Sequence, residues 1–229
     1  MVTKENFKEM LKLENIELTD QMMQQFDLYF QLISQYNKVM DLTAVSEEND
    51  VYDRHFYNSL TIAFKNNFNG LSICDVGAGA GFPSIPLKIA FPNMKLTIID
   101  PLSKRMEFLK IVINKLNLSD VNVVKARAED ACKVMKENFD LVTARAVARL
   151  NILTELISQL VKKDGLFVSM KGQKGEEELI EAQNALKTCK FELVKQSQHG
   201  QSINYYFKKI DHTPNKYPRN YGQIKNKPL

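Results

Sequence analysis

A short glycine-rich segment carries the clearest chemical implication in this sequence. Three of the nine glycines fall within five positions, in the run Asp75-Val76-Gly77-Ala78-Gly79-Ala80-Gly81. Glycines spaced in this way let the backbone turn sharply and let a ligand approach it closely. An apolar run precedes the segment, and Pro83 suits the first turn of a helix behind it. We therefore expect a strand, a tight ligand-binding loop and a helix, with a turn that binds nothing as the alternative.

A second acidic residue follows at the distance that a nucleoside site requires. Asp100 ends the next apolar run, 19 residues after Gly81. A carboxylate at the tip of a parallel strand can accept both ribose hydroxyls of a nucleoside that lies across the carboxyl edge of the sheet. The alternative for Asp100 is a capping role before Pro101.

The spacing of the glycines distinguishes two classes of nucleoside ligand. Dinucleotide-binding loops have the pattern G-x-G-x-x-G, whereas this loop is G-x-G-x-G with Asp75 two residues before it. An acid in that place suits S-adenosylmethionine, which carries a sulfonium and an ammonium group and no phosphate. The loop resembles motif I of the S-adenosylmethionine-dependent methyltransferases.

The rest of the chain predicts the elements that hold this loop. Residues 1–60 have a helical pattern, with Thr19 and Ser46 as N-caps and an apolar stripe at Met23, Phe26, Phe30 and Ile33. From residue 71, short apolar runs alternate with amphipathic stretches, which is typical of βαβ units and a mostly parallel sheet. These runs cover 71–76, 96–100, 121–125, 139–144, 166–170, 191–196 and 204–210, with helices at 83–90, 103–117, 129–136, 150–161 and 176–189. The last two runs are too close for a crossover helix, so we expect them to form an antiparallel hairpin.

These elements predict an α/β fold of the class I S-adenosylmethionine-dependent methyltransferase type. It has a Rossmann-like seven-stranded sheet with an antiparallel last hairpin, and the superfamily that it resembles has the strand order 3-2-1-4-5-7-6. We divide the chain into an N-terminal helical extension (1–60), a methyltransferase domain (61–210) and a basic C-terminal tail (211–229).

Composition and charge indicate in which compartment the protein acts and what kind of partner it binds. Apolar residues make up 44% of the chain and charged residues 25%, which is an ordinary globular balance. The sequence shows no signal peptide and no membrane-spanning segment, so we expect no membrane association. Cys74, Cys132 and Cys189 are scattered singly, and we therefore expect a cytoplasmic protein without disulfides. Residues 208–229 hold six basic residues against one acidic residue, and this predicts a polyanionic partner.

The end of the fourth apolar run bears on the methyl acceptor. It carries neither the N-P-P-Y motif of amino-directed methyltransferases nor a cysteine nucleophile, and the only histidines are His55, His199 and His212. Without a histidine–acid pair to deprotonate the acceptor, the sequence favours an acceptor such as guanine N7, whose lone pair can attack directly. No pattern of metal ligands is present, so we expect no metal.

A longer ordered set of segments identifies the family. The segments are Tyr36-Asn37-Lys38, Leu42-Thr43-Ala44, Arg54-His55, Ser59-Leu60, Asp75 to Leu87, Lys104-Arg105, Phe108-Leu109, Arg127-Ala128-Glu129, Thr143-Ala144-Arg145-Ala146, Lys171-Gly172, Tyr217-Pro218-Arg219 and Lys227-Pro228-Leu229. In these, the chain resembles the RsmG (GidB) family, the bacterial 16S ribosomal RNA guanine-N7 methyltransferases. It departs slightly at Asp41 and Tyr36, where the family usually has Asn and often has Trp.

The resemblance implies site residues and a substrate. It implies S-adenosylmethionine contacts at Gly77, Phe82, Ala128, Glu129 and Arg145, to which the residue patterns add Asp75, Gly79 and Asp100. It also implies a guanine in the decoding-region loop of 16S rRNA as substrate, and a link between loss of activity and streptomycin resistance. Whether naked rRNA, an assembly intermediate or the finished small subunit is methylated stays open.

Several polar residues are candidates for positioning the substrate. Arg145 is expected to position the cofactor carboxylate, the guanine or a phosphate, with no general base, and Asn37 to tie the N-terminal helices to the cofactor domain. Lys104 and Arg105 open a helix whose dipole disfavours them, which indicates a phosphate or cofactor-side role. Residues expected to contact RNA are Arg54, His55, Lys171, Arg219 and Lys225.

The tail and the function class have open alternatives. Residues 214–229 are too polar and proline-rich to predict a core element, so we expect them to contact phosphates, with Tyr217 or Tyr221 stacking on an unpaired base. We expect a monomer. A methyltransferase for a small molecule or a protein, and a nonenzymatic RNA-binding module with a vestigial fold, are the alternatives.

Overall fold

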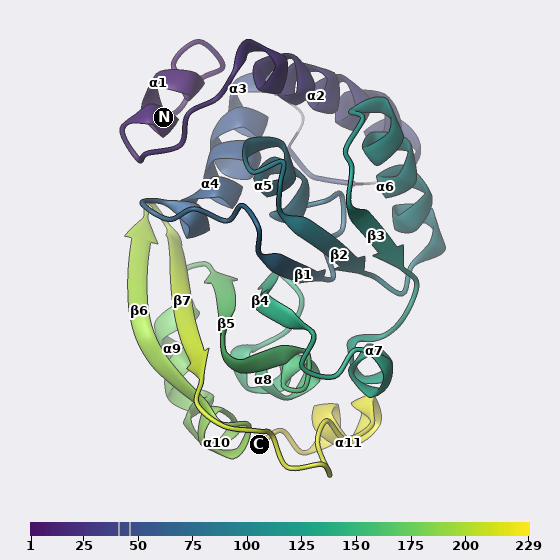
Figure 1. Cartoon of the computed structure of the whole chain (residues 1–229), viewed down its shortest axis with the longest axis vertical. Coiled ribbons are helices and arrows are strands. Elements are labelled where there is room, and N and C mark those ends of the chain that lie inside the picture. The colour runs from purple at the N-terminus through teal and green to yellow at the C-terminus, as the bar shows by residue number, and fades with distance from the viewer. Residues whose placement is uncertain (41, 46) are drawn as a thin grey trace. The chain divides into compact units, whose positions relative to one another are not determined.

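A seven-stranded sheet organises the protein. The structure is a computed structural model that describes residues 1–40, 42–45 and 47–229. The strands follow the order β3-β2-β1-β4-β5-β7-β6 (Figure 1). The β2–β3, β1–β4 and β4–β5 pairings are parallel, and β7 pairs antiparallel with both β5 and β6. This confirms the predicted fold class and the hairpin. The strands are β1 (Ser72–Val76), β2 (Lys95–Ile99), β3 (Val121–Val124), β4 (Phe139–Arg145), β5 (Val161–Lys171), β6 (Phe191–His199) and β7 (Ser202–Lys209).

The chain divides into two compact units. The first comprises Met1–Gly70 and Ala78–Lys125, and the second comprises Leu71–Gly77 and Ala126–Leu229. The glycine loop is the point at which the chain passes from the second unit back into the first, between Gly77 and Ala78.

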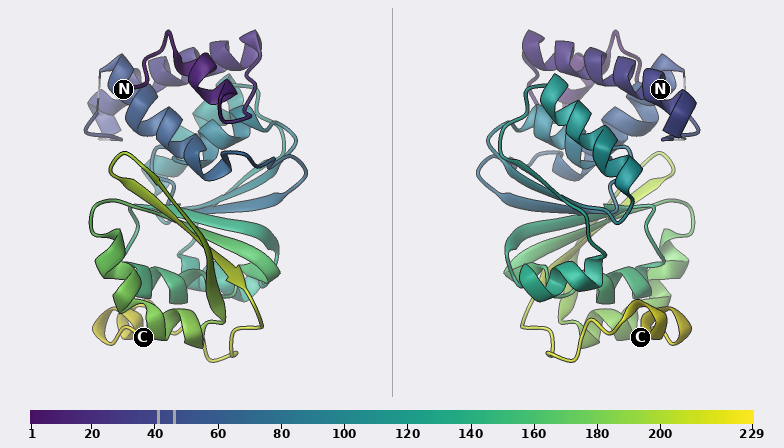
Figure 2. Two further views of the ribbon diagram at one scale, coloured as in Figure 1. Left: turned by 90° about the vertical axis from the view of Figure 1, so that its left-hand side faces the viewer. Right: turned by 90° about the vertical axis from the view of Figure 1, so that its right-hand side faces the viewer.

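The first unit contains β2, β3 and all the helices that precede β3. Figure 2 shows these helices gathered on one side of the two parallel strands. They are α1 (Phe7–Lys12), α2 (Asp20–Met40), α3 (Glu48–Val51), the π-helix η1 (Tyr52–Tyr57), α4 (Asn58–Leu60), the 3-10 helix η2 (Thr61–Ala63), α5 (Ser84–Ala90) and α6 (Ser103–Lys115). None of the helices that the structure describes combines the length and apolar character needed to cross a bilayer.

Helix α2 begins as predicted, and its buried face includes only half of the predicted stripe, Phe26 and Ile33. The hydroxyl of Thr19 accepts a hydrogen bond from the backbone N–H of Met22 at 3.2 Å, which is an N-cap. The buried face runs through Phe26, Tyr29, Leu32 and Ile33, whereas the predicted stripe residues Met23 and Phe30 are only half-buried. Tyr29 and Leu32, which the predicted stripe did not include, are buried as well. The predicted cap Ser46 lies outside the described residues.

The second unit contains β1 and β4–β7 with five helices. These are α7 (Ala128–Val134), α8 (Leu150–Ile157), α9 (Gly175–Glu181), α10 (Gln183–Thr188) and α11 (Tyr221–Asn226). The helix predicted over 150–161 ends early, because β5 already begins at Val161. A break in the β4–β5 register follows, and Gly165 fits there because an added Cβ would lie 2.9 Å from the carbonyl oxygen of Asp140. The helix predicted over 176–189 is two helices that meet at Ala182.

The C-terminal tail belongs to the packed fold, contrary to the sequence expectation. The buried ammonium of Lys209 donates to the carbonyl oxygens of Ser158 at 2.5 Å and Cys189 at 3.0 Å and to the hydroxyl of Thr213. This burial lowers the pKa of Lys209 to about 8. Further along, Ile224 has no exposed surface. The sequence prediction failed because one apolar residue among polar ones gives no periodic signal.

An ion pair fixes the middle of the tail. The guanidinium of Arg219 donates to both carboxylate oxygens of Glu155, at 2.8 and 2.6 Å, and its backbone N–H donates to the same carboxylate at 2.9 Å. The Glu155 side chain is fully buried on α8. A buried carboxylate of this kind needs its cationic partner.

Replacing Arg219 should therefore unfold the protein more readily. We expect Arg219→Ala to lower the free energy of unfolding by about 3–5 kcal/mol, because it leaves a buried carboxylate without a partner. Urea denaturation measures this, and Lys225→Ala, which removes an exposed charge from the same tail, should leave the midpoint unchanged. Equal stability of Arg219→Ala and the wild type would contradict the structural role of the tail.

Candidate cofactor and substrate site

The glycine loop starts in the second unit, at a position that only glycine fits. Gly77 follows β1 with φ +72°, and an added Cβ would lie 2.7 Å from Cγ2 of Val147. Both the backbone conformation and the contact exclude a side chain. The loop therefore begins tightly packed against the segment that follows β4.

The first unit holds the other end of the loop. The hydroxyl of Tyr29, on α2, donates to the carbonyl oxygen of Ala80 at 2.6 Å in a buried position. Gly81 has φ +105°, and an added Cβ would lie 2.6 Å from Cγ1 of Ile85 and 2.8 Å from the Tyr29 hydroxyl. Gly79, with φ +60°, has open space where its Cβ would stand. The loop is thus packed at its two outer glycines and open at the central one.

An aromatic stack supports the residue after the loop. The ring of His55 lies over that of Phe82, with centroids 4.6 Å apart and planes inclined by 14°. His55 Nε2 is 2.7 Å from the hydroxyl of Thr43. The side-chain amide of Asn37 donates to the carbonyl oxygen of Thr43 at 2.8 Å and accepts from its backbone N–H at 2.9 Å. Asn37 therefore connects α2 to Phe82 through Thr43 and His55, in agreement with the tie predicted for it.

Asp100 is a fully buried acid with an unsatisfied oxygen. Its Oδ1 accepts a hydrogen bond from the backbone N–H of Leu102 at 2.9 Å. This is a local contact of the kind that the capping alternative predicted. The Oδ2 of Asp100 is buried and, within the described part of the chain, accepts no hydrogen bond. Nη1 of Arg105 approaches it at 3.5 Å, an ion-pair distance, while Lys104 is exposed. A buried carboxylate oxygen without a donor is costly, and a ligand hydroxyl would satisfy it.

In the second unit, β1 and β4 place the predicted polar residues on one sheet face. Asp75 is fully buried and stands opposite Thr143 in the parallel register. Because side chains alternate along a strand, Arg145 shares the face of Thr143. Arg145 is half-buried, and Ala146 after it has φ +57°. A non-glycine residue in this region is uncommon and is often found near functional sites.

The start of α7 presents the predicted Ala128 and Glu129. Both are buried, with exposed fractions of 8% each. Arg127, the residue before them, donates from Nε to Oε1 of Glu129 at 2.7 Å. Sequence reasoning did not assign this arginine a role, although its place in the Arg127-Ala128-Glu129 motif was a signal.

Helix α9 organises the loop after Arg145 by means of acidic residues that the sequence reading missed. Oε2 of Glu178 accepts the backbone N–H of Leu150 at 2.8 Å and pairs with Nζ of Lys171 at 2.7 Å. Lys171 also donates to the carbonyl oxygen of Ala148 at 2.7 Å, and burial is the main cause of its lowered pKa. Lys171 was predicted to contact RNA, but its side chain is only 8% exposed and is occupied by these protein groups.

The five residues predicted to contact RNA differ in accessibility. Arg54 is 61% exposed at its side chain and lies 3.7 Å from Asp50, and Lys225 is exposed. His55, Lys171 and Arg219 instead contact protein groups, as described above. Among the described residues, no cluster of three or more His, Cys, Asp or Glu side chains is arranged for a metal ion.

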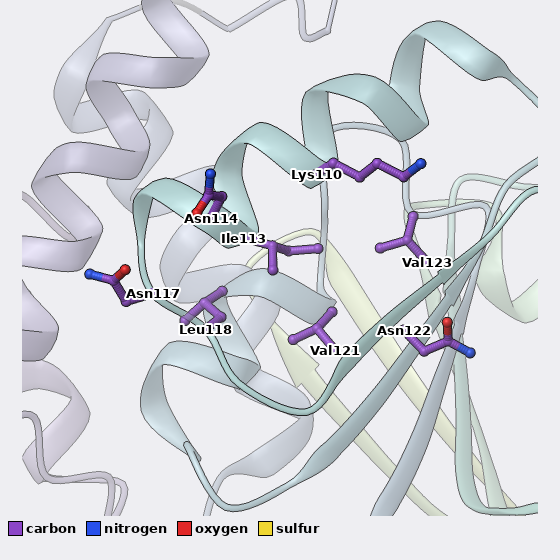
Figure 3. Close-up of a pocket in the computed structure, with 8 residues that line it drawn as sticks. All are labelled: Lys110, Ile113, Asn114, Asn117, Leu118, Val121, Asn122 and Val123. Carbon is purple, nitrogen blue, oxygen red and sulfur yellow. The ribbon is translucent and has the colours of Figure 1, made fainter.

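A surface cavity of about 510 Å³ lies elsewhere in the first unit. Figure 3 shows it along the second half of α6 and β3. Its lining residues are Lys110, Ile113, Asn114, Asn117, Leu118, Val121, Asn122 and Val123. None of the residues predicted to bind cofactor or RNA is among them, so we do not assign the cofactor to this cavity.

The loop geometry predicts unequal costs for two glycine substitutions. Gly79→Ala should destabilise the protein by about 1–2 kcal/mol, the cost of left-handed backbone for an L-residue. Gly81→Ala should lose a further ~1–3 kcal/mol, because its methyl group collides with Ile85 and Tyr29. Urea unfolding of the two variants side by side tests this, and equal losses would show that the contact from α2 does not constrain the loop.

Comparisons with known proteins find relatives that match this chain over its whole length. The curated relatives include a protein of Staphylococcus aureus strain Newman named ribosomal RNA small subunit methyltransferase G, 48% identical over all of this chain and 99% of its own length. The counterpart in strain JH9 is 47% identical with the same coverage.

Solved structures show the same fold at low sequence identity. An S-adenosylmethionine-dependent methyltransferase from Aquifex aeolicus matches with a TM-score of 0.58 and 18% identity, over 77% of this chain and 97% of that one. The structure of M. jannaschii TYW2 in complex with AdoMet matches with a TM-score of 0.56 and 18% identity, over 68% of this chain and 76% of that one. The profile described as GidB, rRNA small subunit methyltransferase G, matches residues 22–204. The chain belongs to the GidB family.

Proposed function

We propose that this protein transfers a methyl group from S-adenosylmethionine to N7 of a guanine in the decoding-region loop of 16S rRNA. Membership of the GidB family supports the reaction and the substrate class. The observation in the structure that carries the cofactor assignment is the buried Oδ2 of Asp100, which accepts no hydrogen bond from the described residues. Ribose hydroxyls are the donors that such a carboxylate binds in nucleoside sites.

The residues present fit an adenosine-containing ligand. In the first unit, Gly79 leaves open space beside the loop, Phe82 offers an apolar ring and Asp100 offers the acceptor. In the second unit, the candidates are Asp75, Gly77, Ala128, Glu129 and Arg145. We propose that these residues bind S-adenosylmethionine, which supplies an electrophilic methyl group when bound.

Methyl transfer to guanine N7 requires the protein to orient the two reactants more than to transfer a proton. The N7 lone pair of guanine lies in the plane of the ring, and methylation there leaves a cationic purine with no proton to remove. Holding the two reactants in line can supply roughly 7–11 kcal/mol of the barrier in favourable cases. Arg145 is our candidate for positioning the reactants, because its guanidinium can make planar paired contacts to a carboxylate, a phosphate or a base edge. We assign no general base.

The contacts to RNA follow from accessibility. Arg54 and Lys225 are exposed cations, so we propose them as the first phosphate contacts. Lys171 is paired with Glu178 and Arg219 with Glu155, so an RNA phosphate would have to share each cation with its carboxylate. We therefore rank these two residues lower as RNA contacts. We propose a cytoplasmic monomer in which 61–210 is the methyltransferase domain, acting on rRNA or on the small subunit.

A binding experiment tests the cofactor assignment. Asp100→Asn keeps the volume and one acceptor for Leu102 but loses the charge, so S-adenosylmethionine affinity should fall by about tenfold or more, since hydrogen bonds to charged groups contribute about 1.5–3 kcal/mol. Calorimetry measures this. Asp130→Asn, an exposed acid paired with Lys133, is the matched control and should bind as the wild type does. Unchanged affinity of Asp100→Asn would remove it from the ribose role.

A modification map tests the reaction. Nucleoside mass mapping of 16S rRNA from cells with and without this protein should find one 7-methylguanosine in the decoding region that depends on it. Purified protein and S-adenosylmethionine should restore that methyl group to the rRNA or small subunits of the deletion strain. If the methyl group stays in the deletion strain while a protein or small molecule loses one, the proposed acceptor is wrong.

A further inference from the structure

Helix α11 holds one aromatic ring in a fixed place in the second unit. Its apolar residue Ile224 is fully buried, and the Asn220 side chain caps the helix by accepting the backbone N–H of Gln223 at 3.0 Å. The preceding residue, Arg219, is tied to buried Glu155. Tyr221, the first residue of α11, therefore projects from an anchored segment.

The ring of Tyr221 supports the arginine that binds Glu129. The guanidinium carbon of Arg127 lies 4.4 Å from the centre of the Tyr221 ring, within the range of a cation–π contact. Arg127 is 49% exposed at its side chain, and its Nε lies 2.7 Å from Oε1 of Glu129, whose side chain is 10% exposed. Figure 1 shows α11 close to α7, whose first turn contains Glu129. The tail thus contacts a predicted cofactor residue through one arginine.

Each contact in this series limits the freedom of the next group. A half-exposed arginine on its own samples many rotamers, and ordering it costs conformational entropy. The ring of Tyr221 removes part of that freedom before any ligand arrives. Arg127 then holds one carboxylate oxygen of Glu129 and leaves Oε2 as the acceptor for a ligand donor. Preorganisation of this kind raises affinity without a new ligand contact.

We propose that Tyr221 and Arg127 are positioning residues for Glu129, so that the C-terminal tail sets the affinity of the cofactor site. The inference rests on the proposed function, in which Glu129 contacts S-adenosylmethionine. It assigns the tail a role in cofactor binding, where the sequence alone favoured RNA contact.

Calorimetry with S-adenosylhomocysteine, on the full chain, tests the proposal. Tyr221→Ala should weaken binding about threefold, the size expected of an exposed cation–π contact, whereas Tyr221→Phe keeps the ring and should bind as the wild type does. Arg127→Lys leaves α11 intact but cannot contact the ring and the carboxylate in the same planar way, so it should weaken binding about three- to tenfold. Lys133→Ala, which removes another ion pair of α7, is the matched control and should have no effect.

A double-mutant cycle separates positioning from a general effect on the fold. In a Glu129→Gln background, Tyr221→Ala should cause little further loss, because the group that it positions has lost its charge. Melting temperatures of the single variants should stay close to that of the wild type. The proposal is overturned if Tyr221→Ala and Arg127→Lys bind as the wild type does, if Tyr221→Phe is as weak as Tyr221→Ala, or if the loss persists in full beside Glu129→Gln. Failure of the wild type to bind would instead contradict the proposed function.

Discussion

The hydrogen bond from Tyr29 to the carbonyl oxygen of Ala80 is the contact on which the glycine loop depends. It joins the middle of α2 to the loop backbone at 2.6 Å, and the same hydroxyl occupies the space that a side chain at residue 81 would need. The loop conformation is therefore set by a helix more than fifty positions away in the sequence as well as by its glycines. His55 adds a second support by stacking on Phe82. The N-terminal helices therefore support the glycine loop that we propose binds the cofactor.

In the second unit, ion pairs on buried or half-buried carboxylates hold the chain segments in place. Glu178 binds Lys171 and the backbone N–H of Leu150, and Lys171 binds the carbonyl oxygen of Ala148, so these contacts hold the chain where it enters α8. Glu155 binds Arg219 and holds the tail against α8. In each case a carboxylate removed from water needs a cation and N–H donors at close range, so the partners cannot be exchanged freely.

Local patterns allowed the strands and most helices to be predicted, because alternating apolar runs and glycine spacing are short-range signals. The places of Gly77, Gly81 and Asp100 in a tight turn and at a strand end were also accessible to sequence reasoning, since they follow from glycine spacing and from the end of an apolar run. The partners of buried charges were not. Nothing in the order of residues indicates that Glu178 meets Lys171 or that Glu155 meets Arg219, because such pairs depend on tertiary placement.

The same limit explains why composition overstated the number of cations that the tail offers to a polyanion. Six basic residues occur in 208–229, but Lys209 donates to buried oxygens and Arg219 neutralises Glu155. Lys208 pairs with Asp164 at 2.9 Å, an exposed contact that RNA can replace at little cost.

The cations left for a polyanion are therefore fewer than the sequence suggests, and they are spread along the chain. Each neutralised phosphate on single-stranded RNA contributes only about 0.7 to the slope of log affinity against log salt. A site with scattered cations then gains modest affinity from charge alone. Selection of one guanine must rest on the shape of the RNA and on contacts to the base itself.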